Sequence, residues 1–153
     1  MPQITDLASV RQARLNRSHN PDKTFTSWKF DVLNCLFVDP RSDATAKIVA
    51  VFILQHVNQH TGAAFPGIET ISDGTAISAR HVRRAIKLLQ QTGWLTVTRK
   101  NRRAPNVYTF SERNMNQMLD RLAILREGRA GARLKKRAFE RTQESYQKWF
   151  DRT

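Results

Sequence analysis

Apolar and polar positions alternate with helical spacing over most of the chain. Apolar side chains are concentrated at residues 26–38, before Pro40, which predicts a short helix. A second helix is expected to start from Ser42 as N-cap, with Asp43 in its first turn and Gly62 as its stop. Its apolar positions recur at helical spacing and are Ile48, Val49, Phe52, Ile53 and Val57.

Two further helices, separated by a tight turn, are expected next. Pro66 opens the first, which ends near Gly74. Ser78 is the expected N-cap of the second and Gly93 its stop. The inward-facing positions of the second helix are Val82, Ile86 and Leu89.

The pattern then changes from helical to alternating. Residues 94–98 and 107–110 are expected to be two strands of a hairpin, joined by a polar loop at 99–106. Beyond Ser111 the helical period returns, and Gly128 and Gly131 are expected to interrupt it before a last basic helix at about 134–150. Apolar residues on one side of the first part are Met115, Met118, Leu119, Leu122 and Leu125. The expected fold is therefore mainly α, with a small β-hairpin and a C-terminal helical extension.

Charge separates this chain from an ordinary globular domain. Its 26 Lys and Arg residues against 13 Asp and Glu residues give a formal net charge of +13 and a pI near 11.1, which favours a polyanionic partner. Between Ser78 and Asn106 there is no Asp or Glu. The basic residues of that segment are Arg80, Arg83, Arg84, Lys87, Arg99, Lys100, Arg102 and Arg103. Nucleic acid and an anionic membrane are the two candidate partners.

The segment from Pro66 to Leu89 has the apolar positions that two steeply crossing helices require. Ile71, Ile77, Val82 and Ile86 are expected to make the inward contacts, with small Ser72 at the closest approach of the helices. In this arrangement Ser78 caps the second helix by accepting a hydrogen bond from a backbone N–H in its first turn.

With these positions assigned, the stretch from about Ala64 to Phe110 resembles the winged helix-turn-helix domains of bacterial regulators and of phage and plasmid replication proteins. The resemblance implies a winged helix-turn-helix fold and DNA as the ligand. The turn position that is usually Gly is Ala76 here, with Gly74 two residues earlier. Alanine is tolerated at this position if the turn avoids positive φ. The matching motifs are Pro66, Ile71-Ser72, Ile77-Ser78, Val82-Arg83-Arg84 and Gly93-Trp94-Leu95.

The expected DNA-binding residues fall on a recognition helix, residues 78–91, and on a basic wing, residues 99–106. Arginines on the helix are suited to clamp guanine O6 and N7, and the wing is suited to phosphates or the minor groove. The alternative for these basic residues is a solvated face, and for His81 a neutral surface group. The helix positions are Ser78, Ala79, Arg80, His81, Arg83, Arg84 and Lys87. The wing positions are Arg99, Lys100, Asn101, Arg102, Arg103 and Asn106.

Motifs of catalysis and of metal binding are lacking in the sequence. It shows no phosphate-binding glycine loop, nucleophile elbow or cysteine pair, so no enzyme activity and no cofactor are expected. His56 and His60 stand four residues apart, yet no further Cys or carboxylate completes a metal site. The single cysteine, Cys35, is expected to be a buried apolar residue, and Tyr108 a hairpin side chain packed on the core.

Three segments are expected: a flexible basic arm at 1–23, a winged helix-turn-helix domain at 24–111, and a helical extension at 112–153. The extension has three candidate roles, which are homodimerisation, folding back on its own domain, and additional DNA contact. No apolar run reaches the roughly 20 residues of a membrane span, and the first six residues lack the features of a secretory signal. A cytoplasmic bacterial protein associated with nucleoid, plasmid or phage DNA is expected.

The function expected from these features is site-specific binding of double-stranded DNA by a transcriptional regulator. A homodimer on an inverted repeat, with half-sites about 34 Å apart, is the expected assembly. The alternatives are a plasmid or phage replication or partition protein that binds origin repeats, and an adaptor that uses its winged helix to bind protein. The operator sequence and the choice between activation and repression stay open.

Overall fold

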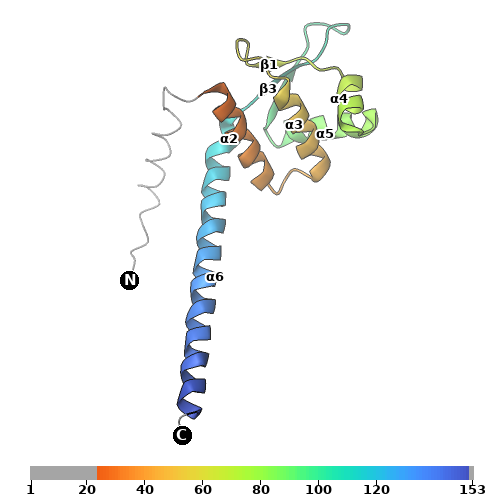
Figure 1. Cartoon of the computed structure of the whole chain (residues 1–153). Helices are drawn as coiled ribbons and strands as arrows, with labels where there is room; N and C mark the ends of the chain where they lie inside the picture. Colours follow the sequence, from red (N-terminus) through yellow and green to blue (C-terminus); the bar gives the residue numbers. More distant parts are fainter. Residues whose placement is uncertain (1–23, 152–153) are drawn as a thin grey trace. The chain divides into compact units, whose positions relative to one another are not determined.

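The computed structural model describes residues 24–151, apart from the side chains of Tyr146 and Phe150. The expected basic arm at 1–23 lies outside the described residues. The chain divides into two compact units, of which the first ends at Met118 and the second begins at Leu119. Figure 1 labels the α-helices of both units.

The first two helices are α2, Phe25–Val38, and α3, Ala44–Gln55. The prediction of a helix over 26–38 is confirmed, and the Thr24 side chain caps it by accepting a hydrogen bond from the Ser27 backbone N–H at 3.1 Å. The predicted N-cap of α3 is wrong by one residue. Asp43, and not Ser42, accepts the hydrogen bond from the Ala46 N–H, at 2.8 Å. The Asp43 carboxylate thus satisfies a free donor of the first turn.

The predicted end of α3 at Gly62 is also wrong. The helix stops at Gln55, where His56 is the C-cap and its Nδ1 lies 2.8 Å from the Phe52 carbonyl oxygen. Gly62, at φ 67°, instead belongs to a turn closed by the hydrogen bond from its N–H to the Asn58 carbonyl, at 2.8 Å. That turn leads the chain into the first strand.

The next two helices are α4, Ile68–Thr75, and α5, Ala79–Gln91. Ser78 is the N-cap of α5, as predicted, and Gly93 follows its end at φ 80°. The Ser72 hydroxyl donates a hydrogen bond to the Ile77 carbonyl at 2.6 Å and so links α4 to the turn before α5.

The turn between α4 and α5 does not avoid positive φ. Ala76 lies there in the left-handed region, at φ 57° and ψ 26°. Alanine pays a steric penalty of about 1–2 kcal/mol in that conformation, because its Cβ crowds the carbonyl oxygen. Gly74 serves a different need, since a Cβ there would lie 2.2 Å from Cε2 of Phe52. The glycine therefore permits α4 to approach α3.

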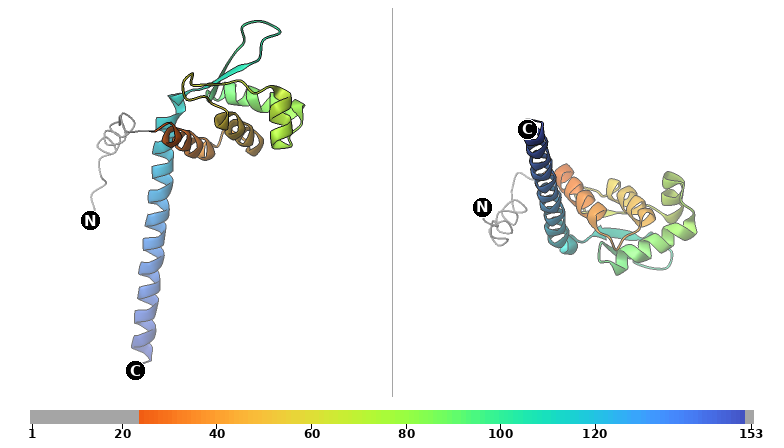
Figure 2. Two further views of the ribbon diagram at one scale, coloured as in Figure 1. Left: turned by 45° about the horizontal axis from the view of Figure 1, so that its top comes forward. Right: turned by 90° about the horizontal axis from the view of Figure 1, so that it is seen from below.

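A three-stranded antiparallel sheet completes the first unit, with the order β1-β3-β2. The strands are β1, Ala63–Ala64, β2, Leu95–Thr98, and β3, Val107–Phe110. The hairpin of β2 and β3 confirms the prediction and pairs Leu95 with Phe110, and its loop extends beyond the helices (Figure 2). The short β1 was not predicted, because two alanines carry no strand pattern.

The core of the first unit lies between the helices and the sheet. Trp94 and Tyr108 are its largest fully buried side chains. The prediction that Tyr108 packs on the core is confirmed, and burial raises the pKa of its phenol above the ordinary value. Cys35 is buried too, as predicted. The buried face of α5 consists of Val82, Ala85, Ile86 and Leu89.

A buried carboxylate fastens the link between α2 and α3 to the residue before β2. Asp39 is 0% exposed and accepts hydrogen bonds from Trp94 Nε1 at 2.8 Å and from the Arg41 guanidinium at 2.6 Å. Burial by itself raises the pKa of Asp39, but the hydrogen bonds from Arg41 and Trp94 outweigh it and lower the pKa to about 2. The carboxylate stays ionised in the core because these donors replace its water.

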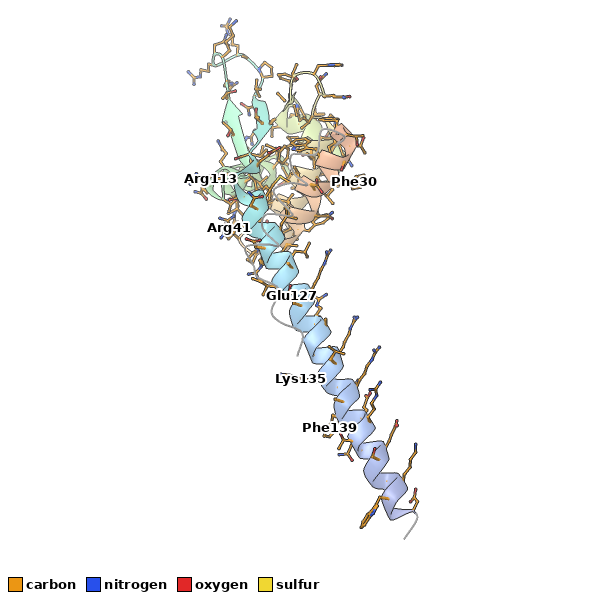
Figure 3. The ribbon with its side chains drawn as sticks, turned by 90° about the vertical axis from the view of Figure 1, so that its left-hand side faces the viewer. Phe30, Arg41, Arg113, Glu127, Lys135 and Phe139 are labelled. Carbon is orange, nitrogen blue, oxygen red and sulfur yellow. The ribbon has the colours of Figure 1, made fainter. Side chains whose placement is uncertain are left out.

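After a 3-10 turn at Glu112–Asn114, the helix α6 runs without interruption from Met115 to Phe150. The predicted break at Gly128 and Gly131 is wrong, since both lie inside the helix. A glycine costs a helix about 1 kcal/mol, which good helix formers on either side can offset. Met115 and Met118 are buried within the first unit. Farther along, side chains such as Lys135 and Phe139 extend from one continuous ribbon (Figure 3).

None of the helices in the part of the chain that the structure describes has both the length and the apolar character of a membrane span.

Candidate nucleic-acid interface

The helix α5 has two opposite faces. Its buried face packs in the core, while its basic side chains are exposed. At 3.6 residues per turn the exposed basic side chains fall within an arc of about 100° around the helix axis. Four side chains form this basic face of α5: Arg80, Arg83, Arg84 and Lys87. The predicted placement of these residues opposite Val82, Ile86 and Leu89 agrees with the structure.

Among the described residues, no ion pair neutralises the basic face of α5. Ion pairs between described side chains join Arg41 to Asp39 and Lys136 to Glu140, and neither involves α5 or the wing loop, residues 99–106. Like charges held this close repel one another, so binding of a polyanion stabilises them.

The first turn of α5 is fixed by Ser78. Its hydroxyl accepts a hydrogen bond from the His81 N–H at 3.4 Å and lies 2.7 Å from His81 Nδ1. Ala79 is half-buried, and Arg80 and His81 are exposed. Ser78 therefore sets the direction in which α5 begins, and its hydroxyl is already engaged with His81.

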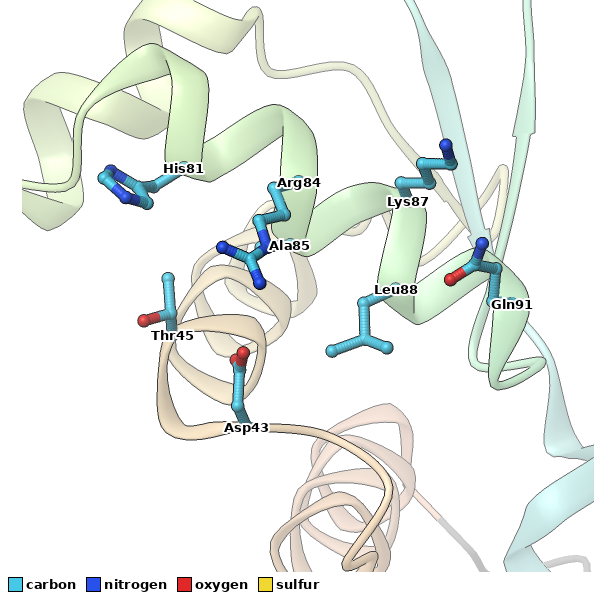
Figure 4. Close-up of a pocket in the computed structure, with 8 residues that line it drawn as sticks. All are labelled: Asp43, Thr45, His81, Arg84, Ala85, Lys87, Leu88 and Gln91. Atoms are coloured by element: carbon cyan, nitrogen blue, oxygen red, sulfur yellow. The ribbon is translucent and has the colours of Figure 1, made fainter.

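A surface pocket of about 460 Å³ lies along α5, beside the N-terminal end of α3. Figure 4 shows Arg84 reaching from α5 toward Asp43 and Thr45. Sequence reasoning did not place Asp43 and Thr45 here, because they are about 40 residues away from Arg84 in the chain. The pocket is lined by Asp43, Thr45, His81, Arg84, Ala85, Lys87, Leu88 and Gln91.

The wing loop is held together by its own polar side chains. Arg99 Nε donates a hydrogen bond to the Ala104 carbonyl at 2.8 Å, and its terminal nitrogen donates to the Arg102 carbonyl. Asn101 Oδ1 accepts hydrogen bonds from the backbone N–H groups of Arg103 and Ala104, at 3.0 and 2.8 Å. These hydrogen bonds fix the backbone of the wing loop.

These bonds divide the predicted wing residues into two groups. Arg99, Asn101 and Asn106 have partners within the hairpin, since Asn106 Nδ2 donates a hydrogen bond to the Tyr108 hydroxyl at 3.2 Å. The second group consists of wing residues whose cationic side chains are exposed and form no hydrogen bond to another described residue: Lys100, Arg102 and Arg103. Asparagine favours turns in which its side chain bonds the backbone two residues on, so Asn101 carried a recognisable signal.

His56 and His60, which stand four residues apart as in some metal sites, do not lie on the same helix. His56 is the C-cap of α3, and His60 lies beyond the end of that helix. His56 packs its ring against Phe52, with the ring centroids 4.4 Å apart. Among residues 24–151 no group of three or more His, Cys, Asp or Glu residues is arranged to hold a metal ion.

Comparison with known families identifies the central part of this unit. Residues 44–95 match the family model of a helix-turn-helix domain, which spans α3, β1, α4, α5 and the start of β2. The antiparallel hairpin of β2 and β3 that follows α5 is consistent with a wing. Comparisons with curated proteins and with solved structures gave no match.

Proposed function

Because residues 44–95 form a helix-turn-helix domain, we propose that the chain binds specific sequences of double-stranded DNA and regulates transcription. The observation that carries this proposal is the basic face of α5, which forms no ion pair with another described side chain. The helix is set at a fixed angle by Ser78 and by the buried side chains opposite the arginines. The major groove is about 12 Å wide and admits a helix of this kind.

In this proposal α5 and the wing loop have different tasks. Arg80, Arg83 and Arg84 meet base edges, where an arginine that clamps guanine O6 and N7 contributes about 1–3 kcal/mol of discrimination. Lys100 and Arg102 neutralise phosphates, which adds affinity without reading sequence. The ordered wing loop supports this division, because its backbone is held by Arg99 and Asn101.

The test of specificity is selection from a pool of random 30-base-pair duplexes by the full chain. We expect the pool to converge on a motif after a few rounds. We also expect affinity for that motif to fall steeply with salt, with a log–log slope near −5 if about six phosphates are neutralised. A pool that binds but never converges argues against specific recognition, and affinity indifferent to salt argues against DNA binding altogether.

Two matched substitutions separate base contacts from phosphate contacts. Arg83→Gln on α5 and Arg102→Gln on the wing loop remove one charge each from exposed side chains. We expect R83Q to lower affinity for the selected motif and to relax the preference at one or two base pairs. R102Q should weaken binding to all duplexes alike and reduce the magnitude of the salt slope by about 1. Identical effects of the two substitutions contradict the proposed division.

Homodimerisation through the C-terminal helices is the second part of the proposal. Large apolar side chains of the second unit are strongly exposed in the single chain, with exposed fractions of 60% for Ile124, 66% for Leu134 and 64% for Phe139. Pairing with the same helix of a second copy buries them and gives the two-fold symmetry of an inverted repeat. We expect sedimentation of the full chain to give a dimer, and the double variant L134Q/F139Q to give monomers.

Regulation is distinguished from replication by where the chain binds in its own genome. Sites at promoters support the proposed role in transcription. Binding to clustered repeats at an origin instead supports a role in replication or partition and contradicts the proposed role in transcription.

A further inference from the structure

The second unit carries a row of arginines along one face of α6. Successive members are three or four residues apart, which is the spacing that keeps side chains on one face of a helix. At 3.6 residues per turn they fall within an arc of about 120° and span about 22 Å along the helix axis. We call them the arginine stripe: Arg126, Arg129, Arg133, Arg137 and Arg141.

All five guanidinium groups of the arginine stripe belong to exposed residues, and none forms an ion pair with another described side chain. Between residues 128 and 139 the helix has no carboxylate. The nearest carboxylate on the same face is Glu140, which is paired with Lys136 at 3.8 Å. The middle of the stripe therefore presents a run of positive charge to solvent.

The opposite face of α6 has a different character. Ile124, Phe139 and Trp149 lie on the half of the helix away from the stripe, with Lys135 in the middle of that half, and Leu134 lies at the boundary between the two halves. The charged face and the proposed dimer face thus occupy different sides of one helix. A second copy can cover the apolar side and leave the stripe accessible.

We propose that the arginine stripe is a second DNA-binding site, which contacts the phosphates of duplex DNA without reading its sequence. It lies outside the helix-turn-helix domain and is additional to α5 and the wing loop. Arginine is suited to this role, because its planar guanidinium pairs with phosphate through two parallel hydrogen bonds. Each phosphate neutralised also releases a condensed counterion, so the stripe strengthens binding most at low salt.

Duplex DNA fits the stripe better than a membrane or duplex RNA does. A helix lying on a membrane buries its apolar face, which would carry Lys135 into the lipid. In duplex RNA the major groove is deep and narrow and excludes side chains. A helix with its side chains is about 10–12 Å across, which matches the major groove of DNA, about 12 Å wide.

The test compares two double variants of the full chain that carry the same net charge. Arg133→Gln with Arg137→Gln removes two members of the stripe, and Arg121→Gln with Lys135→Gln removes two exposed charges from the other side of α6. Because Lys135 lies on the proposed dimer face, sedimentation checks that both variants keep the oligomeric state of the native chain. Glutamine is a good helix former, and circular dichroism at 222 nm checks that both variants stay helical. The probe is a 30-base-pair duplex without the selected motif, titrated by fluorescence anisotropy at several salt concentrations.

We expect the stripe variant to lose about 2 units from the magnitude of the salt slope, at about 0.9 for each phosphate contact. The control variant should lose less than about 0.5 unit, since its charges act only at long range through the counterion atmosphere. Equal slopes for the two variants overturn the proposal. So does a stripe variant that keeps its DNA slope but loses binding to vesicles of phosphatidylserine, because that result assigns the stripe to lipid.

The outcome is separable from that of the proposed function. Replacing Arg80, Arg83 and Arg84 by glutamine tests α5 on the selected motif, whereas the stripe variants are tested on a duplex without it. If the α5 variant still binds the motif normally, the proposed role of α5 is wrong. The role of the stripe is then still tested by the salt slope on the duplex without the motif. If the salt slopes of the stripe variant and the control variant coincide, the proposed role of the stripe fails while motif selection by α5 is unaffected.

Discussion

The buried carboxylate of Asp39 gives a stability prediction with a defined magnitude. Asp39→Asn removes the charge that holds the Arg41 guanidinium and weakens the acceptor of the Trp94 indole N–H. A tenfold change in proton affinity equals about 1.4 kcal/mol, so lowering the pKa from 3.8 to about 2 corresponds to about 2.4 kcal/mol. Arg41 is 44% exposed, and solvent screening there reduces the expected loss to about 2 kcal/mol.

The same carboxylate makes the stability of the first unit depend on pH. Its pKa is lowered in the folded state, so its contribution is complete above the unfolded pKa of about 3.8 and is lost as pH falls toward 2. Linkage with these two values leaves about half of the contribution at pH 3. The difference in unfolding free energy between the native chain and D39N should therefore shrink from about 2 kcal/mol at pH 7 to about 1 at pH 3.

Urea denaturation, followed by tryptophan fluorescence and by circular dichroism at both pH values, measures this difference. The control is Asp73→Asn, which removes an exposed carboxylate of α4 that has no hydrogen bond to another described residue and should change stability by less than about 0.5 kcal/mol. A D39N chain as stable as the native one at pH 7 refutes the reasoning. A difference that stays constant down to pH 3 refutes the role of ionisation.

Three further predictions concern the turn and the wing loop. Ala76→Gly should raise the free energy of unfolding by about 0.5–1 kcal/mol, because relief of the left-handed strain exceeds the added freedom of the unfolded chain; thermal unfolding checks the sign. Gly74→Ala should destabilise by about 1–2 kcal/mol through contact with the Phe52 ring, and the double variant with Phe52→Leu should recover part of the loss in urea denaturation. Arg99→Lys keeps the charge but loses the fork that holds the wing loop, so affinity for the selected duplex should fall about 3–10-fold in anisotropy titrations, whereas Arg102→Lys should stay within about twofold.

The order of elements followed from periodicity, because each helix of the first unit exposes one face and buries the other. Val82, Ile86 and Leu89 recur at helical spacing and are buried, so their pattern alone placed α5 and its basic face. The helix ends were harder to predict. Ser42 and Asp43 are both good N-cap residues, and only the backbone geometry decides which of them meets the free N–H of Ala46.

Contacts between residues far apart in the chain could not be predicted from the sequence. Asp39 and Trp94 are 55 residues apart, and nothing in the residues around either one indicates that they meet in the core. The same holds for Asp43 and Arg84, which approach only because α3 and α5 pack side by side. Electrostatic reasoning along the chain therefore found the basic face but missed the carboxylate beside it.

Gly74 and Ala76 show how the contact of α4 with Phe52 accounts for the position of the glycine in this turn. The position that is usually glycine in these turns is Ala76, and it still has positive φ. Glycine is present two residues earlier, where a Cβ would collide with Phe52. The steric demand of the turn is modest, about 1–2 kcal/mol, and packing elsewhere can offset it. A Cβ 2.2 Å from an aromatic carbon leaves no room unless the ring moves. The combination G74A/A76G, which restores the usual turn glycine, should therefore be no more stable than the native chain, because the clash in the helix interface outweighs the relief in the turn.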